Sequence, residues 1–241
     1  MNISDLKNKI ILGILFILPV IFLLFLYPST NNYNPLETVQ SDITELTGFT
    51  SDSNDEMKLE GNITLLGFLG RDPVSKALPA LNLKELIYDK FKGFKKFQVI
   101  MLVPNGSENG VKQLENELYQ YDQLKYWHFA YGDQEEILKV FNSLNSDFTL
   151  DNNLGANHIF IIDKDRNQRG RKDDRDKKEK EKNVDAYPLL SYNCIEVAEL
   201  KNKMASEDMR VLFTEYRQKR KGDFNTDSRR EQDLKGNDEK I

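Results

Sequence analysis

Sulfur and imidazole are scarce in this chain. Its 241 residues include one cysteine, Cys194, and two histidines, His128 and His158, which stand far apart in the sequence. A single cysteine forms no disulfide within its own chain, and a structural zinc site needs about four Cys or His ligands. The sequence therefore excludes a disulfide framework and argues against a structural zinc site.

Clustered charge of one sign and short catalytic motifs are also missing. The chain has 34 Lys and Arg against 39 Asp and Glu, with both signs mixed. Nucleic-acid-binding domains usually carry a clustered basic excess, so nucleic acid is not expected as a partner. The motifs G-x-x-x-x-G-K-[ST], H-E-x-x-H and G-x-S-x-G do not occur. The common motif-bearing enzyme classes therefore have no support.

One long apolar run stands near the N-terminus. Residues 10–27 read IILGILFILPVIFLLFLY without a charged side chain, and as a helix they would span about 27 Å, close to a hydrocarbon core of ~30 Å. Lys7 and Lys9 precede the run, so the positive-inside rule places residues 1–9 in the cytoplasm. We expect an uncleaved transmembrane anchor, with a cleaved signal peptide as the alternative. Asn-, Lys- and Ile-rich usage without a transit peptide predicts a bacterial inner membrane, with the domain in the periplasm.

Two polar segments bracket the remaining chain. Residues 28–60 are rich in Asn, Ser, Thr, Asp and Glu, which predicts a flexible tether that holds a domain off the membrane. Residues 222–241 have almost no apolar content and are expected to form a disordered tail. A folded domain is thus predicted over residues 61–221.

Strands and helices alternate in this domain, which predicts a central sheet with helices on both faces. The mixed-charge run 174–185 is typical of a solvated loop or an exposed helix. Asn193 and Glu196 resemble a capping box at the start of a long helix over 194–221. Apolar periodicity predicts strands at 63–69, 97–104, 125–132 and 158–165, helices at 79–92, 108–122 and 133–144, and a hairpin return at 167–173.

Three segments carry a family resemblance. WHFAYGDQEEILKVFNSL (127–144) leads a Trp-headed strand through Gly-Asp into an acidic helix start, and IFIIDKDRNQRGRKDD (159–174) ends a strand on Asp and returns through Arg-Gly. LFTEYRQKRK (212–221) closes the domain. In this order they resemble the SCO/SenC family, thioredoxin-fold copper chaperones of cytochrome c oxidase assembly. The resemblance covers about residues 60–220 and implies an α/β, thioredoxin-like central sheet flanked by helices, with one N-terminal transmembrane helix.

The segment GFLGRDPVSKALPALNLKEL (67–86) falls where that family carries its copper-binding Cys-x-x-x-Cys loop, but it contains no thiol. One alignment sets Arg71 and Ser75 at the cysteine positions, and the other sets Asp72 and Lys76. Cu(I) chaperoning relies on soft thiolates, and dithiol exchange needs a second sulfur. The chain is therefore expected to be a degenerate member.

The histidine ligand of the family is also displaced. It stands about eight residues before the aspartate that ends the strand, where this chain has Gly155, and His158 lies only five residues before Asp163. The ligand role is therefore not transferred to His158. No metal, cofactor or catalytic residue is predicted.

The remaining candidates are few. Arg71, Asp72, Pro73, Ser75 and Lys76 form a vestigial loop and a candidate interaction site, because charged side chains there stand beside a helix N-terminus. His158 is a weak candidate at the start of its strand. Cys194 is another, because a helix start lowers a thiol pKa, although an inert packed cysteine is the ordinary interpretation. His128 alternates with aromatic residues and is expected to face solvent.

Three hypotheses of function remain open. The first is a membrane-tethered, non-catalytic binding or assembly factor linked to respiratory oxidase or metal-centre biogenesis, as the resemblance implies. The second is an enzyme that uses the charged loop 71–76 on an anionic substrate. The third is a structural envelope protein that docks on a neighbouring protein.

Overall fold

The computed structural model describes residues 12–22, 35–51, 57–118 and 124–221. The chain divides into two compact units, residues 1–34 and 35–241. In the first unit, residues 12–22 are helical. Among the helices of the described ranges, none is both long and apolar enough to cross a bilayer. Only part of the predicted anchor, 10–27, falls in those ranges, and the predicted tail, 222–241, lies outside them.

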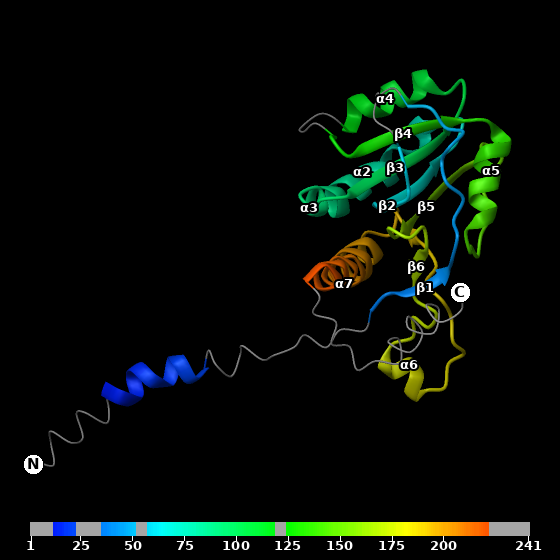
Figure 1. Ribbon diagram of the computed structural model, residues 1–241. Helices are drawn as coiled ribbons and strands as arrows, with labels where there is room; N and C mark the ends of the chain where they lie inside the picture. The colour runs from blue at the N-terminus through cyan, green and yellow to red at the C-terminus, as the bar shows by residue number, and fades with distance from the viewer. Residues whose placement is uncertain (1–11, 23–34, 52–56, 119–123, 222–241) are drawn as a thin grey trace, which may run out of the picture. The chain divides into compact units, whose positions relative to one another are not determined.

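The second unit is built on a mixed sheet with the strand order β1-β6-β5-β2-β3-β4, and β7 pairs with β5 (Figure 1). Strands β2, β3 and β4 are parallel, whereas β5 runs antiparallel to β2, and β6 antiparallel to β5. Two parallel crossings followed by an antiparallel hairpin form a thioredoxin-like sheet. The strands are β1 (Glu37–Gln40), β2 (Ile63–Leu69), β3 (Phe97–Pro104), β4 (Trp127–Gly132), β5 (Gly155–Ile162), β6 (Gln168–Gly170) and β7 (Tyr192–Asn193).

Helices cover both faces of the sheet, as the alternation of elements predicts. On one face Leu65 and Val99 pack with residues of α2, α4 and α7; on the other, Leu66 and Ile100 pack with residues of α5. Because both faces are covered, β2 and β3 are buried along their whole length. The α-helices are α2 (Ala77–Leu83), α3 (Asp89–Phe91), α4 (Glu108–Leu118), α5 (Gln134–Ser143), α6 (Lys177–Glu181) and α7 (Met209–Lys221). A 3-10 helix, η1 (Pro73–Lys76), precedes α2, and two π-helical segments, η2 (Lys84–Tyr88) and η3 (Glu199–Asp208), precede α3 and α7.

The predicted tether, 28–60, is wrong over its described residues. Residues 37–40 form β1, which pairs with β6 at the edge of the sheet. Further along, Ile43 and Leu46 are buried against the α5 face. Thr50 exchanges two backbone hydrogen bonds with Tyr131 of β4. A few apolar side chains, spaced through an otherwise polar sequence, therefore pack this segment against the sheet. The compact unit begins at Pro35.

The end of the domain corrects a second prediction. Asn193 does not form a capping box with Glu196; its Oδ1 accepts the N–H of Ile195 at 3.0 Å, and its own N–H donates to Glu199 at 2.7 Å. The helical backbone begins only at residue 197. Cys194 thus lies in the turn before the helix. The mixed-charge run 174–185, predicted to be a solvated loop or an exposed helix, contains both: Lys177–Glu181 form α6, which buries no residue, and the remaining residues are not helical.

Candidate functional site

The vestigial loop leaves the carboxyl end of β2 and turns directly into η1 and α2. Gly70 has φ +74°, and a Cβ there would lie 2.6 Å from the carbonyl oxygen of Asn153. The N–H of Arg71 donates to that same carbonyl at 2.8 Å. Only glycine permits this close approach. The loop is therefore fixed against the segment 151–155 that leads into β5.

Lys76 makes the one ion pair of this loop among the described residues. Its Nζ lies 3.1 Å from Oδ2 of Asp151, whose Oδ1 accepts the N–H groups of Asn153 at 2.9 Å and Gly155 at 2.8 Å. Burial acts to raise the pKa of Asp151, but the hydrogen bond from Gly155 and the neighbouring Lys76 outweigh it and hold that pKa below its usual value. The Lys76 ammonium is thereby engaged in holding the loop.

The other loop residues are held locally as well. Arg71 Nη2 donates to Gln134 Oε1 at 2.7 Å, at the start of α5. The Ser75 hydroxyl donates to the carbonyl of Asp72 at 2.7 Å, closing the turn. Pro73 is buried against α4, where a Cβ on Gly110 would lie 2.9 Å from its Cδ. The predicted loop residues thus form one fastened surface, in which the Asp72 side chain is exposed.

The residues of this loop do not fit a copper ion. Guanidinium, ammonium, hydroxyl and carboxylate groups stand where Cu(I) requires thiolates. In the part of the chain that the structure describes, no three His, Cys, Asp or Glu side chains gather into a group able to hold a metal. The loop offers instead a fixed surface that bears side chains of both charges.

His158 lies in β5 and Cys194 in the turn after β7, and the two side chains pack on opposite faces of the sheet. His158 pairs with Asn193 in the ladder and stacks on Phe148 with ring centroids 4.3 Å apart. Burial lowers its pKa, against the opposing charge of Asp147. No hydrogen bond or ion pair joins His158 to the loop 71–76 in the described residues. His158 is therefore a packed ring, half-buried on the α5 face. His128 in β4 is also only partly exposed.

Cys194 is an inert core residue. Its side chain is 4% exposed, within the cluster of α2, α4 and α7. Burial raises its pKa, with Glu199 acting in the same direction. Of the two interpretations of Cys194, its surroundings favour the packed cysteine, because the helix begins beyond it and its side chain lies in an apolar cluster.

Sequence reasoning missed a buried ion cluster. Arg169 Nη1 lies 2.9 Å from Asp163 Oδ2, and its Nη2 lies 2.6 Å from Glu215 Oε2. The same guanidinium donates twice to the carbonyl of Leu36, at 3.0 and 2.6 Å. Burial would lower the pKa of Arg169, but Glu215 and Asp163 outweigh it and raise that pKa. Asp163 and Arg169, from the IFIID…RG segment, thus have a structural role. Through Arg169 they connect Leu36, directly before β1, to Glu215 of α7.

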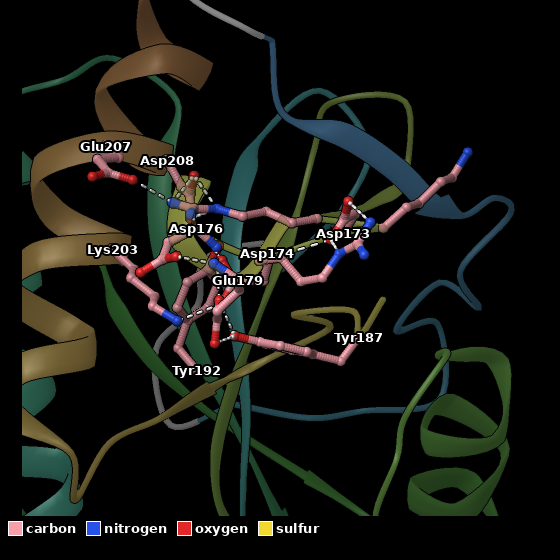
Figure 2. A network of polar contacts seen from close by, with 12 residues as sticks. Asp173, Asp174, Asp176, Glu179, Tyr187, Tyr192, Lys203, Glu207 and Asp208 are labelled. Carbon is pink, nitrogen blue, oxygen red and sulfur yellow. Dashed lines mark hydrogen bonds and ion pairs between the residues drawn. The ribbon is translucent and has the colours of Figure 1, made fainter. Parts of the chain in front are cut away.

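Arg171 belongs to a second polar network, and its partners Asp174, Glu207 and Asp208 are labelled in Figure 2. Its guanidinium pairs with Asp208 at 2.9 Å and with Glu207 at 2.7 Å on the C-terminal helix, and with Asp174 at 2.9 Å. The buried Tyr192 hydroxyl donates to Asp208 Oδ2 at 2.6 Å. Burial raises the pKa of Asp208, although its hydrogen bonds oppose the rise. This network attaches the charged segment after β6 to the folded core.

Comparison with known proteins gives matches among solved structures only, since no protein-family model and no curated protein matches the chain. BsSco, a member of the Sco family of cytochrome c oxidase assembly proteins, is 14% identical, with 70% of this chain and 99% of that chain covered and a TM-score of 0.41. ScoI from Bradyrhizobium japonicum, with copper bound, is 19% identical, with 67% and 98% covered and a TM-score of 0.37.

A third similar structure is the soluble domain of Sco1 from Bacillus subtilis, at 17% identity, with 58% and 84% covered and a TM-score of 0.35. A thioredoxin domain of a thiol-disulfide oxidoreductase from Bacteroides vulgatus also matches, at 18% identity, with 55% and 86% covered and a TM-score of 0.37. Sco proteins and other thioredoxin-like proteins are thus among the solved structures that resemble this chain.

Proposed function

We propose that the protein is a membrane-anchored, extracytoplasmic binding or assembly factor, linked to respiratory oxidase or metal-centre biogenesis and without redox or copper chemistry of its own. The observation that carries this proposal is the loop after β2. It keeps the position of a reactive loop in a thioredoxin-like sheet, yet it presents Arg71, Asp72, Ser75 and Lys76 instead of thiols. Cys194, the only sulfur nucleophile in the sequence, is buried.

The proposed location follows from the apolar run. Residues 10–27 would form a single anchor in a bacterial inner membrane, with the N-terminus in the cytoplasm and the domain from Pro35 in the periplasm. Protease added to spheroplasts should digest the domain while leaving a cytoplasmic marker intact. A domain that resists the protease until the membrane is lysed would contradict this orientation.

Absence of copper chemistry is tested directly by titration. The full-length chain in detergent, titrated with Cu(I) against a competing chelator, should show no stoichiometric binding and no copper–thiolate absorption band. The Cys194→Ser variant is the matched control. One equivalent of copper that is lost in this variant would contradict the proposal, because it would give the buried sulfur a ligand role.

The assembly role is tested by crosslinking in intact membranes. Recovery of oxidase subunits or of metal-delivery proteins supports it, whereas recovery of unrelated envelope proteins alone supports the structural hypothesis. Enzymatic use of the loop on an anionic substrate is disfavoured by its contacts, because Lys76 is held by Asp151 and Arg71 by Gln134. Loss of a measured activity on replacing both cations by Ala, with Tm unchanged, would restore the enzyme hypothesis.

A further inference from the structure

Two lysines lie at the end of the sheet opposite the vestigial loop. That loop leaves the carboxyl end of β2, whereas Lys96 directly precedes β3 and Lys164 stands two residues after β5. β3 runs parallel to β2 and β5 antiparallel to it, so both lysines lie where β2 begins. The carbonyl of Lys96 accepts the N–H of Ile63 at 2.7 Å, and the carbonyl of Lys164 accepts that of Gly61 at 2.8 Å. The two lysines therefore flank the start of β2.

Helix α7 adds further cations at the same place. The Lys164 N–H donates to the Tyr216 hydroxyl at 3.3 Å, and the Lys164 ammonium lies 4.9 Å from the centre of the Tyr216 ring. At about 100° per residue, Phe213, Tyr216, Arg217 and Arg220 fall within about 100° of one another around α7. Arg220 therefore lies one turn beyond Tyr216, on the side of α7 that Lys164 contacts.

These cations act on one another and have no counter-ion in the chain. Burial lowers the pKa of Lys164, and the charges of Arg220 and Lys96 act in the same direction, against the carboxylate of Asp165. Lys96 and Arg220 are exposed, and Lys164 is partly buried. With the described residues, these three side chains and Arg217 make no ion pair. Like charges held together in this way favour the binding of an anion from outside.

An exposed aromatic ring adjoins the cations. Phe94, two residues before Lys96, is 47% exposed, and its ring stacks on that of Phe213 with centroids 4.2 Å apart. Phe213 stacks in turn on Phe91 of α3, with centroids 5.3 Å apart. The Phe94 ring is thus held by a stack that continues into the core. Aromatic and arginine side chains are the residues that most often dominate the energetics of protein interfaces.

Free carboxylates limit the extent of this basic surface. Asp165 follows Lys164 and Glu60 precedes Gly61; both are exposed, and neither makes an ion pair with the described residues. Glu215 of α7 is already paired with Arg169 and Lys219. Four cations therefore adjoin two free carboxylates. A surface of this size fits a short anionic segment, whereas a nucleic-acid backbone is bound by a longer basic surface.

We propose that Phe94, Lys96, Lys164, Arg217 and Arg220, hereafter the basic cluster, bind an acidic peptide segment of a partner protein that carries an apolar side chain among its carboxylates. The carboxylates pair with the cations, and the apolar side chain covers the ring of Phe94. Charge complementarity selects the partner and speeds its association, and the apolar contact excludes water. This site is separate from the loop 71–76 and does not depend on how the chain is anchored.

The test uses the full-length chain in detergent and a fluorescein-labelled peptide of four glutamates around one phenylalanine. Fluorescence anisotropy should show saturable binding that weakens as the salt concentration rises, because salt screens exposed charges. A peptide with glutamine in place of every glutamate should bind at least about tenfold more weakly. A peptide with alanine in place of its phenylalanine should bind about fivefold more weakly.

Matched variants locate the binding site. Lys96→Gln with Arg220→Gln should weaken binding about 5- to 25-fold, since an exposed ion pair contributes up to about fivefold. Lys112→Gln with Lys139→Gln removes the same charge from exposed positions on α4 and α5 and should leave binding within about twofold. Phe94→Ala should weaken binding at least about fivefold. Its Tm is measured alongside, because the change also removes the stack on Phe213, and the charge variants leave that stack intact.

Each other outcome overturns a defined part of the proposal. Absence of saturable binding to the wild-type chain overturns it entirely. Equal binding of the glutamate and glutamine peptides overturns recognition of charge, and equal losses in the two double variants overturn the location. An oligonucleotide that binds more tightly than the peptide, with the same loss in Lys96→Gln/Arg220→Gln, overturns the peptide in favour of a phosphate backbone. Binding that appears only after proteolytic removal of residues 222–241 overturns the partner, because the chain's own C-terminal segment then fills the site.

Discussion

The loop after β2 and the hairpin of β5 and β6 both place charged side chains beside the ends of buried strands. The two regions differ in how far those side chains are exposed to solvent. In the loop, the side chains of Lys76 and Asp151 are 14% and 45% exposed. In the hairpin, those of Arg169 and Asp163 are 4% and 1% exposed, and Glu215 is 8% exposed. Exposed pairs contribute about 0–1 kcal/mol, whereas breaking a buried pair costs about 3–5 kcal/mol. The hairpin charges are therefore expected to contribute more to stability than the loop charges, although Lys76 and Arg71 of the loop also have partners.

The largest expected effect is that of Arg169→Ala. It leaves Asp163 and Glu215 buried without their cation and the carbonyl of Leu36 without its donor. We expect the free energy of unfolding to fall by about 3–5 kcal/mol, as measured by urea denaturation. Arg71→Ala is the matched control at an exposed arginine and should cost less than about 1 kcal/mol. Equal losses in the two variants would contradict the comparison.

Tyr192→Phe should have an intermediate effect. It removes the hydroxyl that donates to Asp208 at 2.6 Å inside the core, while Arg171 still pairs with that carboxylate. We expect a loss of about 1–3 kcal/mol, again by urea denaturation. Tyr187→Phe, which removes an exposed hydroxyl bonded to Glu179, is the control and should stay within about 0.5 kcal/mol. A larger loss in Tyr187→Phe than in Tyr192→Phe would mean that burial of the hydroxyl does not determine how much the free energy of unfolding falls.

A smaller effect is expected for Asp151→Asn, and it depends on pH. The pKa of Asp151 is lower in the folded chain than its usual value. Its contribution is therefore complete above about pH 4 and is lost as the pH falls through the folded-state pKa. The wild type should exceed the variant by less than about 1 kcal/mol near neutral pH, and the gap should close on acidification. A gap that widens as the pH falls would contradict the direction of the pKa shift.

The smallest effect on stability is expected when thiols are put into the loop. Arg71→Cys with Ser75→Cys exchanges two exposed side chains and should change the free energy of unfolding by less than about 1 kcal/mol. The same change should create Cu(I) binding with a thiolate absorption band, because the spacing is Cys-x-x-x-Cys at a strand end. Arg71→Ala with Ser75→Ala is the control. Unfolding of the double-cysteine variant would show that the loop charges are structural after all.

The central sheet was largely predictable from sequence. β2 and β3 have the predicted bounds because they are buried on both faces and read as continuous apolar runs. β5 begins earlier than predicted, at Gly155, because Gly155 still pairs with Leu69 of β2. It ends at Ile162 because Asp163 turns the chain by accepting the N–H groups of Asp165 and Asn167. The ends of a strand depend on the residues it pairs with, and the local periodicity of the sequence does not reveal those residues.

The sequence predicted where the candidate site lies but not the contacts that its side chains make. The loop lies where the sequence placed it, but the partners of its cations, Gln134 and Asp151, stand 63 and 75 residues away. β1 was missed because Leu36, Ile43 and Leu46 show no strand or helix period. The ion cluster was missed because Arg169 reaches a carbonyl 133 residues before it. Such contacts arise from the folded topology, and no local pattern records them.

The guanidinium of Arg169 also bears on how the domain opens. It holds the carbonyl of Leu36, where the compact unit begins, and Glu215 of α7, the last described helix. Fraying normally starts at chain ends, which open independently and cheaply. Here neither end is released without breaking the contacts of the other, so β1 and α7 should exchange their amide hydrogens as one cooperative unit. The two termini of the domain would then be among its slower-opening parts.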